Sequence, residues 1–211
     1  VELLKALKAT GKPVILILTA GRPLALTETE PLADAILYTW SLGDQAGRAM
    51  ADVVFGDVNP SARLSTSFPR NVGQCPIYYN HKNTGRPHQD GAAYSRFNSN
   101  YLDCIHGPLY AFGHGLSYTT FEYSDVTLSN NEMTADGQVK ASVTVTNTGK
   151  RDGKEVVQLY VRDIYATSSR PVKELKGFEK ISLKAGESKT VSFEIGRKQL
   201  EYYNHALQLT V

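Results

Sequence analysis

The sequence lacks the features that would place it in a membrane or on nucleic acid. Its longest continuous apolar run, Val14 to Leu18, is far below the roughly 18 residues that a membrane-spanning helix needs. The 211 residues carry a net charge of only +2, with both signs spread along the chain, whereas nucleic-acid-binding domains usually concentrate basic residues on one surface. A membrane span and a nucleic-acid partner are therefore not expected.

Cysteine is scarce, and its placement does not suit a metal site. Cys75 and Cys104 lack zinc-ligand spacing, and His81 and His88 have no cysteine or histidine at ligand intervals. No metal and no cofactor are expected. The two cysteines would pair as a disulfide in an oxidising compartment or remain separate buried thiols, and the sequence leaves both possibilities open.

Several catalytic and nucleotide-binding motifs are missing. The sequence contains no GxGxxG fingerprint, no P-loop and no GxSxG elbow, which argues against nucleotide binding and serine-hydrolase chemistry. Arg22 follows a predicted strand at the end where open α/β sheets bind ligands, but it suits loop anchoring equally well. The available carboxylates are better explained as cap, helix-surface and turn residues than as a catalytic pair: Asp34, Asp44, Asp52 and Asp57.

The first half of the chain alternates helix and strand patterns. An amphipathic helix is predicted from Glu2 to Ala9. The run VILIL at 14–18 is apolar at every position, which is typical of a parallel strand covered on both faces, and ADAILYTW at 33–40 predicts a second strand. Between Asp44 and Phe55 the apolar residues follow helical spacing, and Gly56 is placed to cap that helix. This order predicts an open α/β sheet.

From about Phe121 onward the pattern changes to a period of two. VKASVTVTN at 139–147 and TVSFEI at 190–195 alternate apolar and polar residues, with turn sequences at 147–153 and 184–188. Regular short strands of this kind indicate a β-sandwich. About six strands are recognisable where about seven are usual, so we expect the last strand to be missing.

The stretch LYAFGHGLSYTTF at 109–121 lies where the two patterns meet. Gly113 and Gly115 permit a tight bend. His114 has no second histidine, cysteine or carboxylate beside it in the sequence, so we interpret it as an interface residue and not as a catalyst. Gly113, His114 and Gly115 are therefore predicted to form a joint between two domains.

The segment CPIYYNHKNTGRPH at 75–88 is the most ligand-like part of the sequence. Aromatic faces pack against the C–H groups of sugars, while amides and guanidinium groups bind hydroxyls. The candidate substrate-binding residues are Tyr79, Asn80, His81 and Arg86. The structural alternative is an ordered loop that seals a domain interface.

Long motifs of this sequence resemble glycoside hydrolase family 3, and most closely its periplasmic β-glucosidase branch. The similarity is carried by KPVILILTAGRPLAL, ADAILYTW, AGRAMADVVFGDVNPSARLSTSFPRNVGQCPIYYNHKNTGRP and LYAFGHGLSYTTF. In the second half, VTNTGKRDGKEVVQLYV and SSRPVKELKGFEKISLKAGES resemble the fibronectin type III-like module that ends such enzymes. The similarity runs in unbroken order along nearly the whole chain.

This resemblance implies an α/β region followed by an all-β region. Residues 1–120 would be the C-terminal part of an α/β sandwich domain including the joint, and residues 121–211 an immunoglobulin/fibronectin type III-like β-sandwich. Because the chain begins at Val1 and not at methionine, we expect it to be a piece of a longer protein. The resemblance implies that the preceding part contains an N-terminal (β/α)8 barrel.

The resemblance also implies a periplasmic or secreted enzyme that hydrolyses terminal β-D-glucosyl residues of glucosides or oligosaccharides with retention. Its nucleophilic Asp and its acid/base Glu would both lie upstream of Val1, and Glu2 lacks the context to replace the latter, so no catalytic residue is assigned here. The isolated chain is expected to be inactive, supplying scaffold and one wall of the sugar pocket. A non-enzymatic carbohydrate-binding or adhesion module is the alternative.

Overall fold

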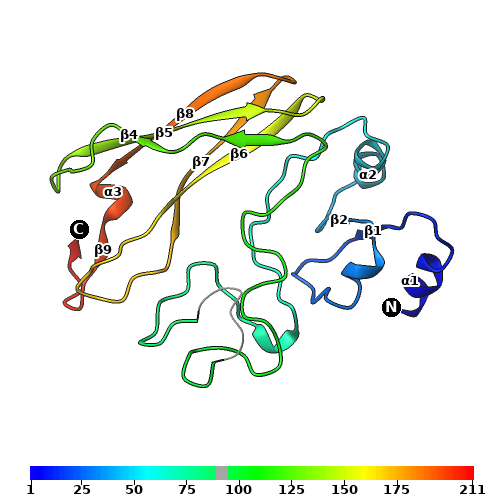
Figure 1. The fold of residues 1–211 in the computed structure, drawn as a ribbon, viewed down its shortest axis with the longest axis horizontal. Helices are drawn as coiled ribbons and strands as arrows, with labels where there is room; N and C mark the ends of the chain where they lie inside the picture. The colour runs from blue at the N-terminus through cyan, green and yellow to red at the C-terminus, as the bar shows by residue number, and fades with distance from the viewer. Residues whose placement is uncertain (89–94) are drawn as a thin grey trace. The chain divides into compact units, whose positions relative to one another are not determined.

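The computed structural model describes residues 1–88 and 95–211, which form two compact units. The first unit comprises Val1–Val58, Leu64–Tyr79 and Thr84–His114. The second comprises Gly115–Val211 together with two short segments from earlier in the chain, Asn59–Arg63 and Asn80–Asn83. Figure 1 traces the chain by colour from the N-terminus to the C-terminus.

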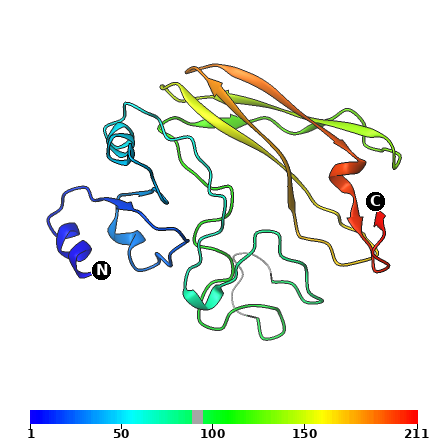
Figure 2. The same ribbon diagram turned by 180° about the vertical axis from the view of Figure 1, so that it is seen from behind.

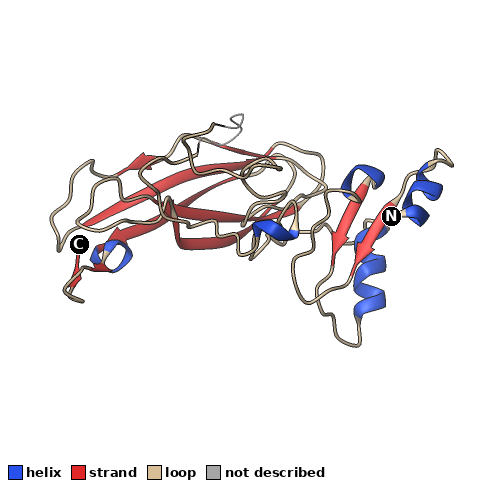
Figure 3. Cartoon of the chain, turned by 90° about the horizontal axis from the view of Figure 1, so that it is seen from below, coloured by secondary structure: helices blue, strands red, loops and turns tan. Residues whose placement is uncertain are grey.

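Short helices and a parallel strand pair make up the regular part of the first unit. In chain order these are α1 (Glu2–Lys8), β1 (Ile15–Leu18), η1 (Glu30–Leu32), β2 (Ala35–Tyr38), α2 (Ala46–Val54) and η2 (Val72–Gln74). Strands β1 and β2 pair in parallel from Ile15↔Ala35 to Leu18↔Tyr38, as Figure 3 shows. Both predicted helices and both predicted strands are confirmed, each with bounds slightly narrower than the sequence pattern.

The prediction that the first strand is covered on both faces is wrong for this chain. Ile15 is 50% exposed and Ile17 is 41% exposed, whereas Leu16 and Leu18 on the other face are half-buried. A pair of strands cannot bury two faces without further layers, and the described part of the chain covers only one of them. One face of β1 therefore presents apolar side chains to the surroundings.

Asp34 connects the first helix to the strand pair. Its carboxylate accepts a hydrogen bond of 2.6 Å from Lys8 Nζ and one of 2.8 Å from the backbone N–H of Val14. The Lys8 hydrogen bond, followed by the Val14 N–H, holds the pKa of Asp34 below its ordinary value. This contact fixes the C-terminal end of α1 beside the entry to β1.

The second unit is a β-sandwich, as predicted. Its elements are β3 (Phe121–Tyr123), β4 (Thr127–Leu128), β5 (Gln138–Asn147), β6 (Gly153–Val161), β7 (Glu174–Leu183), β8 (Ser188–Gly196), α3 (Arg197–Leu200), β9 (Tyr202–Tyr203) and β10 (Leu209–Thr210). Strand β5 pairs with β8 along one edge and with β3 and β4 along the other. Strands β6 and β7 form a second antiparallel sheet, and β9 pairs with β10. Figure 2 shows these layers from behind.

The core of the sandwich follows the alternation in the sequence. Its buried side chains come from four long strands: Val145, Val157, Ile181, Leu183 and Val191. Phe121, Val143 and Phe193 pack against this cluster from its margin. Because alternate residues of a strand point to opposite faces, the period of two placed the inward residues of β5 and β8 correctly.

Both cysteines are free thiols in this structure. Cys75 is exposed, and Cys104 is partly buried. Of the two possibilities left open by the sequence, the structure has the separate thiols, although neither is fully buried.

Candidate functional site

The bend between the two halves of the chain depends on glycine at two positions. Gly113 has φ = +82°, in the left-handed region that favours glycine. A Cβ atom added at Gly115 would approach the carbonyl oxygen of Ala62 closer than the 3.0 Å limit that real Cβ atoms observe. The first glycine supplies a backbone conformation, and the second allows a close approach of two backbone segments within the second unit.

His114 packs within the first unit. Its ring stacks on that of Tyr110, with centroids 5.4 Å apart and planes 14° apart. Its carbonyl oxygen accepts a 2.8 Å hydrogen bond from the backbone N–H of Leu64. These contacts agree with a packing role for the side chain, and the joint itself stays a prediction.

A Gly115→Ala substitution is expected to lower the free energy of unfolding by about 1–3 kcal/mol, because the new methyl group forces the backbone near Ala62 to move. The matched control is Gly47→Ala. Gly47 lies in α2 with open space around it, and the change should raise stability by up to about 1 kcal/mol through helix propensity. Urea denaturation followed by circular dichroism checks both. Equal effects of the two variants would contradict the close-approach argument.

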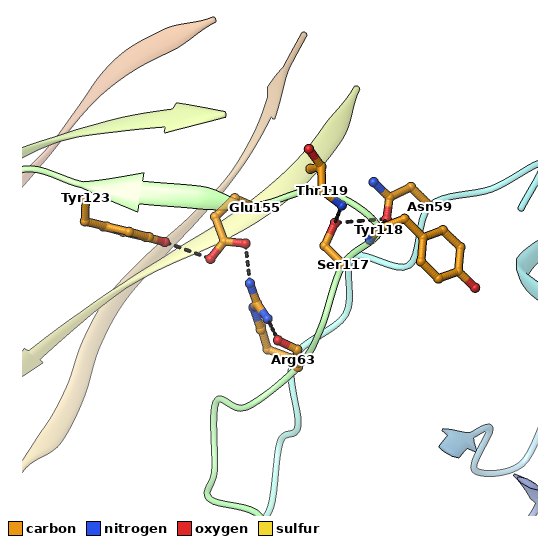
Figure 4. A network of polar contacts seen from close by, with 8 residues as sticks. Asn59, Arg63, Ser117, Tyr118, Thr119, Tyr123 and Glu155 are labelled. Carbon is orange, nitrogen blue, oxygen red and sulfur yellow. Dashed lines mark hydrogen bonds and ion pairs between the residues drawn. The ribbon is translucent and has the colours of Figure 1, made fainter. Parts of the chain in front are cut away.

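A buried carboxylate of the second unit, that of Glu155, forms an ion pair with Arg63, shown in Figure 4. The Arg63 guanidinium donates to Glu155 Oε2 and also to the carbonyl oxygen of Gly115. The Tyr123 hydroxyl donates to the other carboxylate oxygen, Oε1, at 2.7 Å. The Glu155 side chain is only 6% exposed and that of Arg63 only 18%. Both oxygens of the carboxylate are thus occupied, so the group pairs charge and holds the 59–63 segment on the sandwich.

The environment of Tyr123 makes its hydroxyl sensitive to alkaline pH. Burial is the main cause that raises the pKa of Tyr123, and the hydrogen bond to the Glu155 carboxylate raises it further, while the Arg63 charge opposes both. The folded pKa therefore lies above the ordinary tyrosine value of 10.0. Stability from this group is fully present below pH 10 and is lost as the pH rises beyond that value, because the unfolded state releases the proton first.

We expect Tyr123→Phe to flatten the decline in stability above pH 10. At pH 7 the variant should lose about 1 kcal/mol of unfolding free energy, the usual contribution of one hydrogen bond. Urea denaturation at several values between pH 7 and 11 measures both effects. The control is Tyr165→Phe, since Tyr165 is 93% exposed. A decline of unchanged slope in Tyr123→Phe would show that other groups cause it.

One amide side chain, that of Asn59, joins several parts of the same region of the second unit. Asn59 Oδ1 accepts from the Ser117 hydroxyl at 2.9 Å and from the backbone N–H of Tyr118 at 2.8 Å, and its amide donates to the carbonyl of Asp152 at 3.0 Å. Figure 4 shows Asn59 beside Ser117 and Tyr118. Asn59 and Arg63 thus hold both ends of one short segment against the sandwich.

Two of the four candidate substrate-binding residues lie in the first unit. The ring of Tyr79 stacks on Phe112, with centroids 4.2 Å apart and planes 13° apart. The Arg86 guanidinium lies over the ring of Phe97 at 5.7 Å from its centroid, and Phe97 is itself exposed. One face of Tyr79 is therefore occupied by Phe112, while Arg86 and Phe97 form a cation–aromatic pair.

The other two candidates, Asn80 and His81, belong to the second unit. The carbonyl oxygen of His81 accepts a 2.9 Å hydrogen bond from the N–H of Val172, and Lys82 forms an isolated β-bridge with Pro171. The backbone here is held by the sandwich. The four candidates are therefore divided between the two units.

No sequence motif singles out Asn59, Arg63 or Glu155. Arg63 stands in the polar stretch NPSARLSTS. Glu155 directly precedes two valines in the stretch GKEVVQLYV at 153–161. A carboxylate at an inward position of an alternating strand was the available signal, because such a charge needs a partner when buried. The sequence does not identify that partner.

Comparison with protein families places the chain in glycosyl hydrolase family 3. The model of the glycosyl hydrolase family 3 C-terminal domain matches residues 1–118, and that of the fibronectin type III-like domain matches residues 155–211. Because the first match covers more than half of the 211 residues, the chain belongs to this family. The family and fold predicted from the sequence are confirmed.

Individual relatives agree with this assignment. The chain is 58% identical over 207 residues to the "Periplasmic beta-glucosidase" of Salmonella typhimurium. The matched region covers 98% of this chain and 27% of that protein. It is 48% identical over 210 residues to a "Beta-xylosidase" of Formosa agariphila, covering 100% and 28%. The crystal structure of the Listeria innocua β-glucosidase in complex with glucose superposes with a TM-score of 0.95 at 44% identity, covering 99% of this chain and 29% of that one. The chain thus spans little more than a quarter of the length of these relatives.

Within residues 1–88 and 95–211, no helix is long and apolar enough to cross a bilayer. In the same residues, no three His, Cys, Asp or Glu side chains are grouped so that they could hold a metal ion.

Proposed function

We propose that this chain is the C-terminal portion of a retaining β-glucosidase that hydrolyses terminal β-D-glucosyl residues of glucosides or oligosaccharides. The observation that carries the proposal is the 58% identity, over 98% of the chain, to a protein named periplasmic β-glucosidase. Retention requires a carboxylate nucleophile and a carboxylic acid about 5 Å apart. We assign neither to this chain and expect both on the segment that precedes Val1.

The proposed role of this region is to supply scaffold and one wall of the sugar pocket. Tyr79, Asn80, His81 and Arg86 remain the proposed substrate contacts, supported by their polar and aromatic character. For the domains we propose residues 1–120 and 121–211. The change of unit at His114/Gly115 and the family match that ends at residue 118 support a boundary in this region. A periplasmic or secreted location is proposed from the name of the Salmonella relative.

The proposal is tested with the complete protein encoded by the open reading frame around this chain. Purified complete protein should release the aglycone from an aryl β-glucoside. NMR of the sugar anomer that forms first should show that the configuration is retained. Residues 1–211 alone should show no turnover. Inactivity of the complete protein on all β-glucosides would overturn the proposal, and turnover by the isolated chain would overturn the assignment of the catalytic acids.

A β-xylosidase is the second candidate, because a relative at 48% identity carries that name. Comparing kcat/KM of the complete protein on aryl β-glucoside and aryl β-xyloside decides between them. A non-enzymatic carbohydrate-binding module is tested by calorimetry of the complete protein with cellobiose. Micromolar binding without any hydrolysis would favour the module.

The loop residues are tested individually in the complete enzyme. Arg86→Ala should raise KM for a disaccharide several-fold while the melting temperature stays unchanged, because Arg86 contacts Phe97 at an exposed site. The control is Arg48→Ala, which alters a guanidinium that is likewise exposed, on α2. If Arg86→Ala lowers only the melting temperature, the loop is structural.

A further inference from the structure

We propose that Gln74 is a positioning residue that fixes the two ends of the segment carrying the candidate substrate contacts. The inference rests on the proposed function, since that segment includes Tyr79 and Arg86. Gln74 ends the short helix η2 and is 1% exposed. No sequence motif singles it out. The hydrogen bonds of its side chain go to the backbone of Arg70, Ile105 and Gly107, and not to the candidate contacts.

The Gln74 amide joins two separate stretches of the backbone. Its Oε1 accepts a 2.6 Å hydrogen bond from the N–H of Arg70. Its Nε2 donates to the carbonyl oxygens of Ile105 and Gly107, each at 3.2 Å. Both amide hydrogens are therefore used, and one side chain connects the residues that precede Cys75 with those that follow Cys104.

Neighbouring contacts also join the two ends of this segment, which we call its base. The Tyr101 hydroxyl donates to the carbonyl oxygen of Gln74 at 3.5 Å. Phe68 and Tyr110 form an antiparallel bridge in which the N–H of Phe68 donates to the carbonyl of Tyr110 at 2.8 Å. Further along the segment, the N–H of Ser99 donates to the carbonyl of Arg86 at 3.0 Å. The two arms of the segment are thus joined at its base by a buried amide and near Arg86 by an exposed backbone hydrogen bond.

The burial of Gln74 determines what its loss would do. Without its two donors, the carbonyls of Ile105 and Gly107 would lose their amide partner at a partly buried site, which is unfavourable. The arms would then separate or rearrange to find water. Since catalysis depends on sub-ångström positioning of substrate contacts, such a change should weaken substrate binding at Arg86 without altering the chemistry of the reacting groups.

The decisive variant is Gln74→Glu in the complete enzyme. It keeps the shape and the acceptor but replaces the two donors with a carboxylate oxygen facing two carbonyls. We expect KM for a disaccharide to rise about three- to tenfold, with kcat on a small aryl glucoside within about twofold. Lowering the pH should restore KM relative to wild type, because the protonated acid can donate again. Gln45→Glu, the same change at an exposed site before α2, should leave KM unchanged.

Coupling distinguishes positioning from a general loss of stability. In the Gln74→Glu background, adding Arg86→Ala should raise KM by less than twofold, because the Arg86 contact is already displaced. A full additional rise, or an unchanged KM in Gln74→Glu alone, would overturn the inference. If Gln74→Glu does not fold, Gln74→Met, which keeps length without charge, is measured in the same way.

Amide hydrogen exchange provides a readout that does not depend on activity. The N–H of Ser99, which donates to the carbonyl oxygen of Arg86, should exchange at least tenfold faster in Gln74→Glu than in wild type, while the β5 and β8 amides keep their rates. Unchanged exchange at Ser99 would overturn the positioning role of Gln74 even in an active enzyme. If the complete wild-type protein has no β-glucosidase activity, but Gln74→Glu still exchanges faster than wild type, the proposed function is overturned and the positioning role of Gln74 stands.

Discussion

Replacing Arg63 with alanine is expected to lower the free energy of unfolding of the second unit by about 3–5 kcal/mol, the usual cost of removing one partner of a buried ion pair. The substitution leaves the Glu155 carboxylate, 6% exposed, with the Tyr123 hydroxyl as its remaining partner in the network. It also removes the donor to the Gly115 carbonyl. Urea denaturation followed by circular dichroism measures the loss.

Two further variants separate the ion pair from the bulk of the side chain. The double variant Arg63→Met, Glu155→Leu should recover most of the loss, because apolar residues of similar volume often replace a buried pair without cost. Lys189→Ala, which breaks the exposed pair between Lys189 and Glu179, should cost less than about 1 kcal/mol. If Arg63→Ala costs no more than Lys189→Ala, the Arg63 pair contributes no more to stability than a surface contact.

The second large effect is expected at Asn147, the last residue of β5. Its side chain is fully buried, accepts from the Thr119 hydroxyl at 2.7 Å, and donates to the carbonyls of Arg151 and Leu183 at 2.8 and 3.2 Å. Asn147→Ala should therefore cost about 2–4 kcal/mol, because several buried polar groups lose their partner together. The measurement is again urea denaturation of the chain.

The matched control for Asn147 is Asn131→Ala, since Asn131 is exposed and its removal should change stability by no more than about 0.5 kcal/mol. Asn147→Asp adds a second comparison. It keeps the acceptor for Thr119 but directs a carboxylate oxygen at two carbonyls, so it should be at least as destabilising as alanine. A small effect in both Asn147 variants would mean that water replaces the amide at this turn.

The sequence was most informative where one face of an element is buried. The alternation in β5 and β8 identified Val145 and Val191 as core residues because a strand exposes alternate side chains to opposite environments. The exposure of Ile15 and Ile17 was not predictable in the same way. An apolar run reports what a strand could bury, and what covers it depends on other segments.

The contacts that hold separate segments together were also beyond the sequence. Arg63 and Glu155 are 92 positions apart, and nothing local distinguishes this arginine from a surface residue. The same holds for Gln74, whose partners Ile105 and Gly107 are backbone carbonyls. Backbone carbonyls occur at every position, so only the fold determines which of them a given side chain meets. Residue type makes Asn80 and His81 candidate contacts, but it does not predict which unit holds them.

The assignment of Asn59–Arg63 to the second unit bears on where this protein can be divided. A recombinant sandwich that starts at residue 121 would omit the guanidinium that neutralises Glu155 and the Asn59 amide that donates to the carbonyl oxygen of Asp152. Such a truncated product would retain the Tyr123 hydroxyl as a partner of the Glu155 carboxylate but would lack the cation that balances its charge. Supplying the omitted peptide in trans, or fusing it ahead of the sandwich through a short linker, would be the way to obtain this half in soluble form.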